Sequence, residues 1–287
     1  MLQEELLKQI RLIDLKVRKQ VESSLQGAYH TLFKGHGLEF QEVREYVEGE
    51  DVRLMDWNVT ARMGRPFVRV YREERELTVM VVVDVSASTL FGRAWSGREV
   101  AATLGAALAF SAIRNNDKAG LILFSDRIEE YIPPRRGRNH LLTIIRALLT
   151  APATGRRTDP DVPFRFLNKA LKKKALIFFL SDMYFGPLPD SAAVAARRHE
   201  IVPVGLFDRM SYAPERNAFV RARDPESGAA RVLDLSVAAE GRWNTFRKEK
   251  DDAFKRLGTT PLWIENRIDL INDLVLGFKK MQRKAAR

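Results

Sequence analysis

Four continuous apolar runs cross the middle of the chain. They read LTVMVVVD at 77–84, AGLILFSD at 119–126, ALIFFLSD at 175–182 and EIVPVGLF at 200–207. Segments with helical periodicity lie between them, at 98–115, 138–150, 163–174 and 190–199. Runs that are apolar throughout are typical of parallel strands that helices cover on both faces. The pattern therefore predicts an α/β fold with a doubly wound, mostly parallel sheet.

The pattern differs on both sides of these runs. Residues 26–75 alternate short apolar pieces with charged turns, which predicts a β-rich section, and helical spacing in the first 25 residues predicts an amphipathic helix. After Phe207, AFVRARDPESGAARVLDL predicts a β-hairpin, and a polar helix, a last strand and a last helix follow. We therefore divide the chain into an N-terminal section, 1–75, and a main domain, 76–287, with a β-hairpin insertion at about 211–240.

The composition narrows the range of possible functions. The chain of 287 residues contains no cysteine, which excludes disulfides, thiolate zinc sites and cysteine nucleophiles. Its net charge of +11 suits an anionic partner, or simply a basic, well-solvated surface. It lacks an aromatic-rich RNA-binding motif and zinc-finger spacing, so nucleic acid is not the favoured partner. No apolar run approaches the roughly 20 residues that span a bilayer, and no signal peptide is evident. We expect a cytoplasmic protein.

Oxygen-bearing side chains follow the first apolar run, in DVSAS at 84–88. In a near-extended loop Asp84, Ser86 and Ser88 point to one side, and loops at the carboxyl ends of strands gather ligands in doubly wound sheets. Thr158, in TGRRTDP, and Asp182, at the end of the third run, add further oxygens. These five residues suit a hard cation such as Mg²⁺, Mn²⁺ or Ca²⁺ rather than zinc. The alternative is a capped loop that leads into a helix.

Asp126 has the same local setting as Asp182, at the end of the second apolar run. In the common strand order 3-2-1-4, the order reverses between the first and fourth strands, where ligands bind. The run at 175–182 becomes the fourth strand if RIEEYIPP at 127–134 forms an edge strand. We therefore expect Asp182 beside Asp84, and Asp126 on the other side as a solvated loop acid.

The five candidate residues resemble the metal-ion-dependent adhesion site of von Willebrand factor A domains. The upstream sequence GLEFQEVREYVEGEDVRLMDWNVTARMGRPFVRVYREERE resembles the signature of the bacterial family called domain of unknown function fifty-eight. This resemblance extends from about Gly35 to the last helix and implies a von Willebrand A-like, Rossmann-like sheet. Two features depart from the usual pattern: Thr89 replaces a methionine or glycine, and Arg156 and Arg157 replace two glycines beside Thr158.

The resemblance also implies a function. Ser86, Ser88 and Thr158 would touch the ion directly or through water, while Asp84 and Asp182 hold its waters. A glutamate or aspartate of a protein ligand would complete the open position through a charge-assisted contact. Family members are typically encoded beside MoxR-type AAA+ ATPases. The implied role is a non-enzymatic, metal-dependent binding module that serves as adaptor or co-chaperone of such an ATPase.

The N-terminal signature allows two interpretations. Its charged and aromatic residues form either a surface for recognition or a buried ion-pair network with Trp57 as the packing anchor. They are Arg44, Tyr46, Asp51, Arg53, Asp56, Trp57 and Arg62.

Two other functions compete with the binding module. A haloacid-dehalogenase-like phosphotransferase also places an aspartate after an apolar strand, but its second acid would be Ser86 here. A basic nucleic-acid-binding protein would use the net positive charge. A serine hydrolase lacks its Gly-x-Ser-x-Gly elbow, and neither a P-loop nor His-Glu-x-x-His is present.

Overall fold

The computed structural model describes residues 37–74, 77–90, 96–150, 155, 157–208, 219–223, 230–234, 239–266 and 269–285. The helix predicted within the first 25 residues lies outside them. Contacts divide the chain into two compact units, one of residues Phe33–Leu77 and one that contains everything from Thr78 onward.

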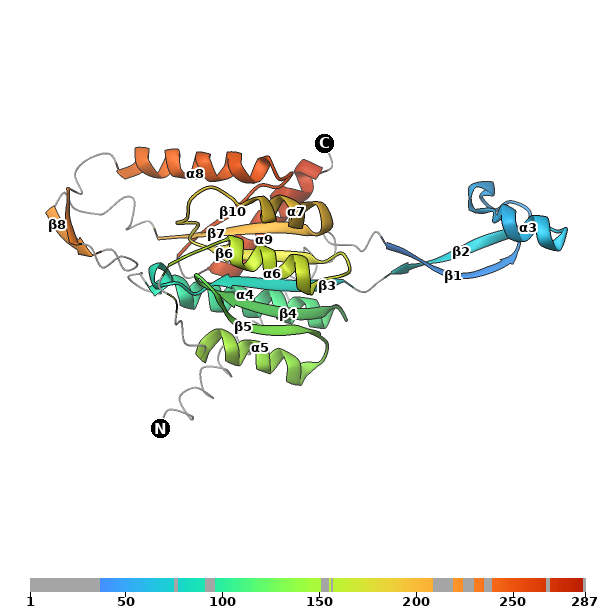
Figure 1. Ribbon diagram of the computed structural model, residues 1–287, viewed down its shortest axis with the longest axis horizontal. Coiled ribbons are helices and arrows are strands. Elements are labelled where there is room, and N and C mark those ends of the chain that lie inside the picture. Colours follow the sequence, from blue (N-terminus) through green and yellow to red (C-terminus); the bar gives the residue numbers. More distant parts are fainter. Residues whose placement is uncertain are drawn as a thin grey trace. The chain divides into compact units, whose positions relative to one another are not determined.

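The larger unit is built on a six-stranded sheet with the order β10-β7-β6-β3-β4-β5 (Figure 1). All neighbouring strands are parallel except β5, which runs antiparallel to β4 at one edge. The predicted doubly wound, mostly parallel α/β fold is therefore confirmed. The strands are β3 (Thr78–Asp84), β4 (Lys118–Phe124), β5 (Ile128–Arg135), β6 (Leu176–Ser181), β7 (Glu200–Phe207) and β10 (Leu262–Glu265).

Helices cover both faces of this sheet. One face packs on α6, α7 and α8, and the other on α4 and α9, with α5 against α4. The helices are α4 (Gly97–Arg114), α5 (Arg138–Thr150), α6 (Asp161–Ala170), α7 (Asp190–Arg198), α8 (Ala239–Lys255) and α9 (Leu270–Ala285). The alanine-rich α4 starts at a capping box, in which Ser96 and Glu99 satisfy each other's backbone N–H groups. In the part of the chain that the structure describes, no helix is both long and apolar enough to cross a bilayer.

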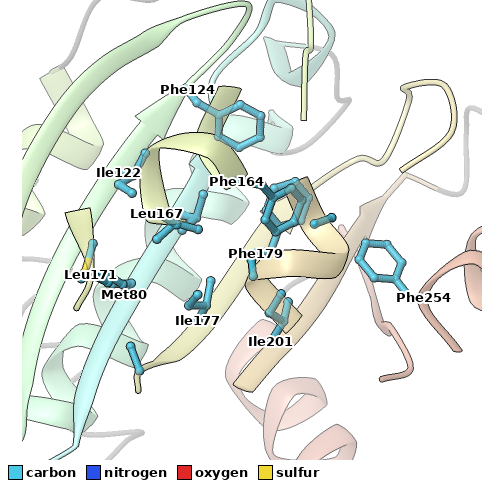
Figure 2. Packing of buried hydrophobic residues seen from close by; sticks show 14 of the residues in the cluster. Met80, Ile122, Phe124, Phe164, Leu167, Leu171, Ile177, Phe179, Ile201 and Phe254 are labelled. Carbon is cyan, nitrogen blue, oxygen red and sulfur yellow. The ribbon is translucent and has the colours of Figure 1, made fainter. Parts of the chain in front are cut away.

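An aromatic stack forms the centre of one face of the sheet (Figure 2). The ring of Phe179 on β6 lies 5.4 Å from that of Phe124 and 5.2 Å from that of Phe164, centroid to centroid. Successive side chains of a strand point to opposite faces of the sheet, so each apolar strand contributes to the core on both faces. This core positions the ends of β3, β4 and β6.

A separate hairpin occupies the predicted insertion. Its strands are β8 (Phe219–Arg223) and β9 (Ala230–Asp234), paired in antiparallel register from Phe219 opposite Asp234. The predicted turn at 224–228 lies outside the described residues.

The smaller unit contains a β-hairpin of β1 (Gly37–Glu45) and β2 (Phe67–Glu74), in a section that the alternating pattern predicted to be β-rich. Between the strands lie a 3-10 turn, η2 (Val52–Leu54), and a short helix, α3 (Trp57–Met63), which we did not predict. The side chain of Asp56 caps α3 by accepting from the N–H groups of Asn58 and Val59, and Gly64 ends it with a left-handed φ of 68°.

The signature residues do not form the buried network of the second interpretation. Ion pairs are present, since Arg69 Nε lies 2.7 Å from Asp56 Oδ2 and Arg44 pairs with Glu50. Trp57, however, is 68% exposed, so the interpretation in which it is a packing anchor is wrong. The reason is that α3 has no buried residue, and hydrogen bonds rather than apolar packing hold it in place.

Candidate functional site

The candidate residues lie at the carboxyl ends of β3 and β6, where the order of the strands in the sheet reverses. β3 pairs with β4 on one side and with β6 on the other. Asp84 ends β3, and Asp182 directly follows β6. Asp182 is therefore on the strand beside Asp84, and Asp126 follows the strand on the opposite side, in the predicted order.

Asp84 forms the buried base of the site. It has 0% of its surface exposed. Its Oδ1 accepts from Ser86 N at 2.9 Å, and its Oδ2 accepts from Ser181 Oγ at 2.8 Å. Burial, reinforced by the negative charge of Asp182, raises the pKa of Asp84 to about 7. The metal-free site therefore holds one carboxylate that is costly to ionise.

The loop after Asp84 contains a 3-10 turn, η3 (Ala87–Leu90), so the near-extended loop that would align the three side chains is not formed. Thr89 closes this turn, because its N–H and its hydroxyl both donate to the carbonyl of Ser86, at 3.2 and 2.7 Å. The turn nevertheless brings Ser86 Oγ within 3.1 Å of Ser88 Oγ. Thr89, which departs from the family pattern, thus has a structural role.

Thr158 reaches the same point from another loop. Its Oγ1 donates to Ser86 Oγ at 2.8 Å, although the two residues are 72 positions apart. The neighbouring Arg157 is exposed to solvent, and Arg156 lies outside the described residues.

Asp182 completes the cluster. Its Oδ1 accepts from Tyr184 N at 3.0 Å, and the Ser88 hydroxyl is hydrogen-bonded to its carboxylate. Burial raises the pKa of Asp182, while these hydrogen bonds and the positive charge of Lys250 oppose the rise. The structure thus brings Asp84, Ser86, Ser88, Thr158 and Asp182 together; their role as metal ligands stays a prediction.

Asp126 lies outside this cluster. Its Oδ1 accepts from Arg127 Nε at 2.8 Å, and its side chain is 34% exposed. It therefore has its own partner and partial access to solvent, as expected of a surface loop acid.

Three residues near the site were not singled out from the sequence. Ser181 bridges the two strands, since it donates to Asp84 and accepts from Met183 N at 2.9 Å. Met183 has a φ of 62°, a left-handed conformation that is rare for residues other than glycine. Ser181 stands directly before Asp182 in the sequence, which is a usable signal, but nothing local indicates the backbone of Met183.

The third, Lys250 on α8, is 8% exposed. Its Nζ donates to the carbonyls of Phe185 and, at 3.2 Å, Gly186, and lies 4.4 Å from the centre of the Phe185 ring. The lysine therefore ties α8 to the loop that carries Asp182. The contact spans 65 residues, so no sequence pattern reveals it.

The donors fit a hard divalent cation. Two neighbouring carboxylates, one fully buried, repel each other, and a cation between them would remove this cost. Three hydroxyl oxygens surround them, and magnesium and calcium prefer oxygen ligands. Among the described residues no group of three or more His, Cys, Asp or Glu could hold a metal, so the hydroxyls would have to contribute.

The metal-free protein is expected to lose stability as the pH rises from about 5 to about 7. Folded Asp84 has a pKa of about 7, whereas an unfolded aspartate titrates near 3.9. The folded state therefore keeps a proton that the unfolded state has released, and a higher pH favours unfolding. We expect the free energy of unfolding in EDTA to fall by about 2 kcal/mol across this range, measured by urea titration. The same slope in Asp84→Asn would show that another group is responsible.

The chain is similar to two solved structures and to a curated protein sequence. BatB from Bacteroides thetaiotaomicron matches with a TM-score of 0.48 and 17% identity, over 72% of this chain and 99% of that one. An aerotolerance-related membrane protein from Bacteroides fragilis matches with a TM-score of 0.46 and 16% identity, over 72% and 99%. The uncharacterized protein Mb1516 of Mycobacterium bovis is 32% identical over 235 residues, 80% of this chain and 74% of that protein. Residues 42–252 match the model of the family described as Protein of unknown function DUF58, and the chain therefore belongs to that family.

Proposed function

We propose that this protein is a non-enzymatic binding module that holds its partner through a divalent cation. Mg²⁺ is the expected ion, with Mn²⁺ or Ca²⁺ as substitutes, because all the donors are oxygens. When bound, the cation would offer an electrophilic position to an acidic side chain of the partner. Ser86, Ser88 and Thr158 would face the ion, and Asp84 and Asp182 would supply the negative charge behind them.

The observation that carries this proposal is the hydrogen bond between Thr158 Oγ1 and Ser86 Oγ, at 2.8 Å. It joins two loops far apart in sequence at the place where two carboxylates lie together. Ser88, Thr158 and Asp182 are partly exposed, while Asp84 and Ser86 are buried. This gradient supports a site that is anchored in the core and open to a partner at its outer side.

The surroundings of Asp84 favour binding over phosphoryl transfer. A nucleophilic carboxylate must meet its substrate, but Asp84 has no exposed surface and both its oxygens accept hydrogen bonds. Ser86 stands where a haloacid-dehalogenase-type enzyme has its second acid, and a hydroxyl is no general acid at neutral pH. We therefore do not propose an enzymatic role.

The partner that we propose is a MoxR-type AAA+ ATPase, for which the protein would act as adaptor or co-chaperone. The chain belongs to the DUF58 family, and the resemblance to that family implies an association with ATPases of this type. Family membership therefore supports this partner. The partly exposed hydroxyls and Asp182 provide a surface for an aspartate or glutamate of the ATPase.

Binding to the purified MoxR-type ATPase from the same organism tests the proposal. We expect the wild-type protein to bind in Mg²⁺, and Ser88→Ala to bind at least about tenfold more weakly, as when a metal site loses a supporting group. Biolayer interferometry gives both affinities. Thr143→Ala, which removes an exposed hydroxyl on α5, is the matched control and should bind like the wild type.

A binding measurement in EDTA is a second test, but EDTA also removes the Mg²⁺ with which the ATPase binds its nucleotide. The variant at the site is therefore the decisive measurement. Equal binding by Ser88→Ala and the wild type would refute the metal-dependent contact. Metal binding without any binding of the ATPase would refute the adaptor role alone.

A further inference from the structure

An irregularity in β5 lies beside the loop that carries Thr158. β5 pairs with β4 with Leu123 opposite Glu130 and Phe124 opposite Ile128. Glu129 is therefore the residue that a β-bulge inserts into the ladder. Bulges bend a strand and redirect a side chain, and they are frequent next to functional sites.

The bulge directs Glu129 toward the Thr158 loop. Glu129 Oε1 accepts from Gly155 N at 2.7 Å and from Ser125 Oγ at 2.5 Å. The carbonyl of Ser125 in turn accepts from Asp159 N at 3.1 Å. Gly155 and Asp159 stand on either side of Thr158, so the loop is held by Glu129 of β5 before the candidate ligand and by Ser125, which follows β4, after it.

The contact at Gly155 requires glycine. A Cβ added at this position would lie 2.1 Å from Ser125 Oγ and 2.4 Å from Asp126 Oδ1, far closer than atoms can approach. The loop therefore comes this near to Ser125 and Glu129 only because residue 155 has no side chain. The tight fit restricts where Gly155 can lie.

From these contacts we infer that Glu129 is a positioning residue of the proposed cation site, which holds the Thr158 loop so that Thr158 Oγ1 reaches Ser86. The inference rests on the proposed function and adds to it a residue outside the five predicted ones. Glu129 acts on the site through the backbone of Gly155 and through Ser125, and the Thr158 hydroxyl transmits the effect.

Glu129 has a second, structural interaction that the test must separate. Its negative charge acts on Arg98 of α4, which is about half buried. Loss of the carboxylate therefore affects the stability of the fold as well as the loop. Glutamine keeps the Oε1 acceptor but lacks the charge, whereas alanine lacks both.

Titration calorimetry with Mn²⁺ as the probe tests the inference on the full-length protein. We expect Glu129→Ala to bind Mn²⁺ about tenfold more weakly than the wild type, in the range for groups that orient metal ligands. Glu129→Gln should stay within about twofold of the wild type, because it retains the acceptor. Glu130→Ala, at the next position of β5, is the matched control and should bind normally. If Glu129→Ala does not fold, Glu129→Asp, one methylene too short to reach Gly155 N, replaces it with the same expectation.

A double-mutant cycle with Thr158→Ala separates positioning from general destabilisation. In the Thr158→Ala background, Glu129→Ala should cause no further loss of Mn²⁺ affinity, because the hydroxyl that it positions is gone. A full tenfold loss in that background, or equal affinities of Glu129→Ala and the wild type, would overturn the inference while the cation site stands. Absence of Mn²⁺ binding by the wild type would overturn the proposed function and this inference with it.

Discussion

Asp84→Asn is expected to lower the affinity for Mg²⁺ or Mn²⁺ by about 100-fold, the upper end of the range for groups behind a metal site. The asparagine has the same size and retains an acceptor for Ser86 N, so the loop keeps its anchor. What disappears is the negative charge at the base of the site, beside Asp182. Titration calorimetry at a pH of about 8, where Asp84 is ionised, measures the loss.

The matched control is Asp126→Asn. Asp126 stands at the end of the neighbouring strand in the same sequence context, but it pairs with Arg127 and is partly exposed. Its variant should bind the metal like the wild type. Unchanged affinity in Asp84→Asn, or a similar loss in both variants, would contradict a cation site between β3 and β6.

Phe179→Ala is expected to destabilise the fold by about 3–5 kcal/mol, the usual cost of replacing a buried phenylalanine by alanine. Phe179 is fully buried, and its ring stacks on Phe124 and Phe164 (Figure 2). It also meets the ring of Phe185 edge-on, at 6.2 Å between the ring centres. The substitution leaves a cavity that a sheet with helices on both faces cannot close. Differential scanning calorimetry should show a midpoint lower by about 10 °C.

Val194→Ala on α7 is the control for this substitution. Val194 is 46% exposed, so its truncation removes little buried surface and should change stability by no more than about 0.5 kcal/mol. A loss below about 1 kcal/mol in Phe179→Ala would mean that the aromatic stack is not the centre of the core.

The sheet could be predicted because each of its central strands is recognisable from a short segment of the sequence. The runs at 77–84, 119–126, 175–182 and 200–207 are apolar except near their ends, and continuous apolar runs are typical of strands with both faces covered. Their lengths and the helices between them then restrict the topology to a few arrangements. The usual strand order of such sheets also predicted Asp182 beside Asp84 and Asp126 on the other side.

In the smaller unit, the pattern of apolar residues predicted less of the structure. A β-rich section was predicted, but α3 was not, and the sequence left open whether Trp57 is exposed or buried. The Asp56 carboxylate, which accepts two backbone hydrogen bonds, and the turn at Gly64 stabilise this helix. Neither feature changes the spacing of apolar residues from which helices are predicted. The sequence therefore could not decide between a buried and an exposed Trp57, and the structure shows that it is exposed.

The sequence by itself determined the class of the fold and the kinds of atoms at the site. The reason is that the spacing of apolar residues and the chemistry of the side-chain oxygens are properties of each short segment. Only the tertiary structure decided how these atoms meet: the turn at Thr89, the bond from Thr158 to Ser86, and the supports from Ser181, Lys250 and Glu129. Several of these contacts join residues 64 to 97 positions apart. Such contacts depend on the packing of whole elements, which no local pattern of side chains contains.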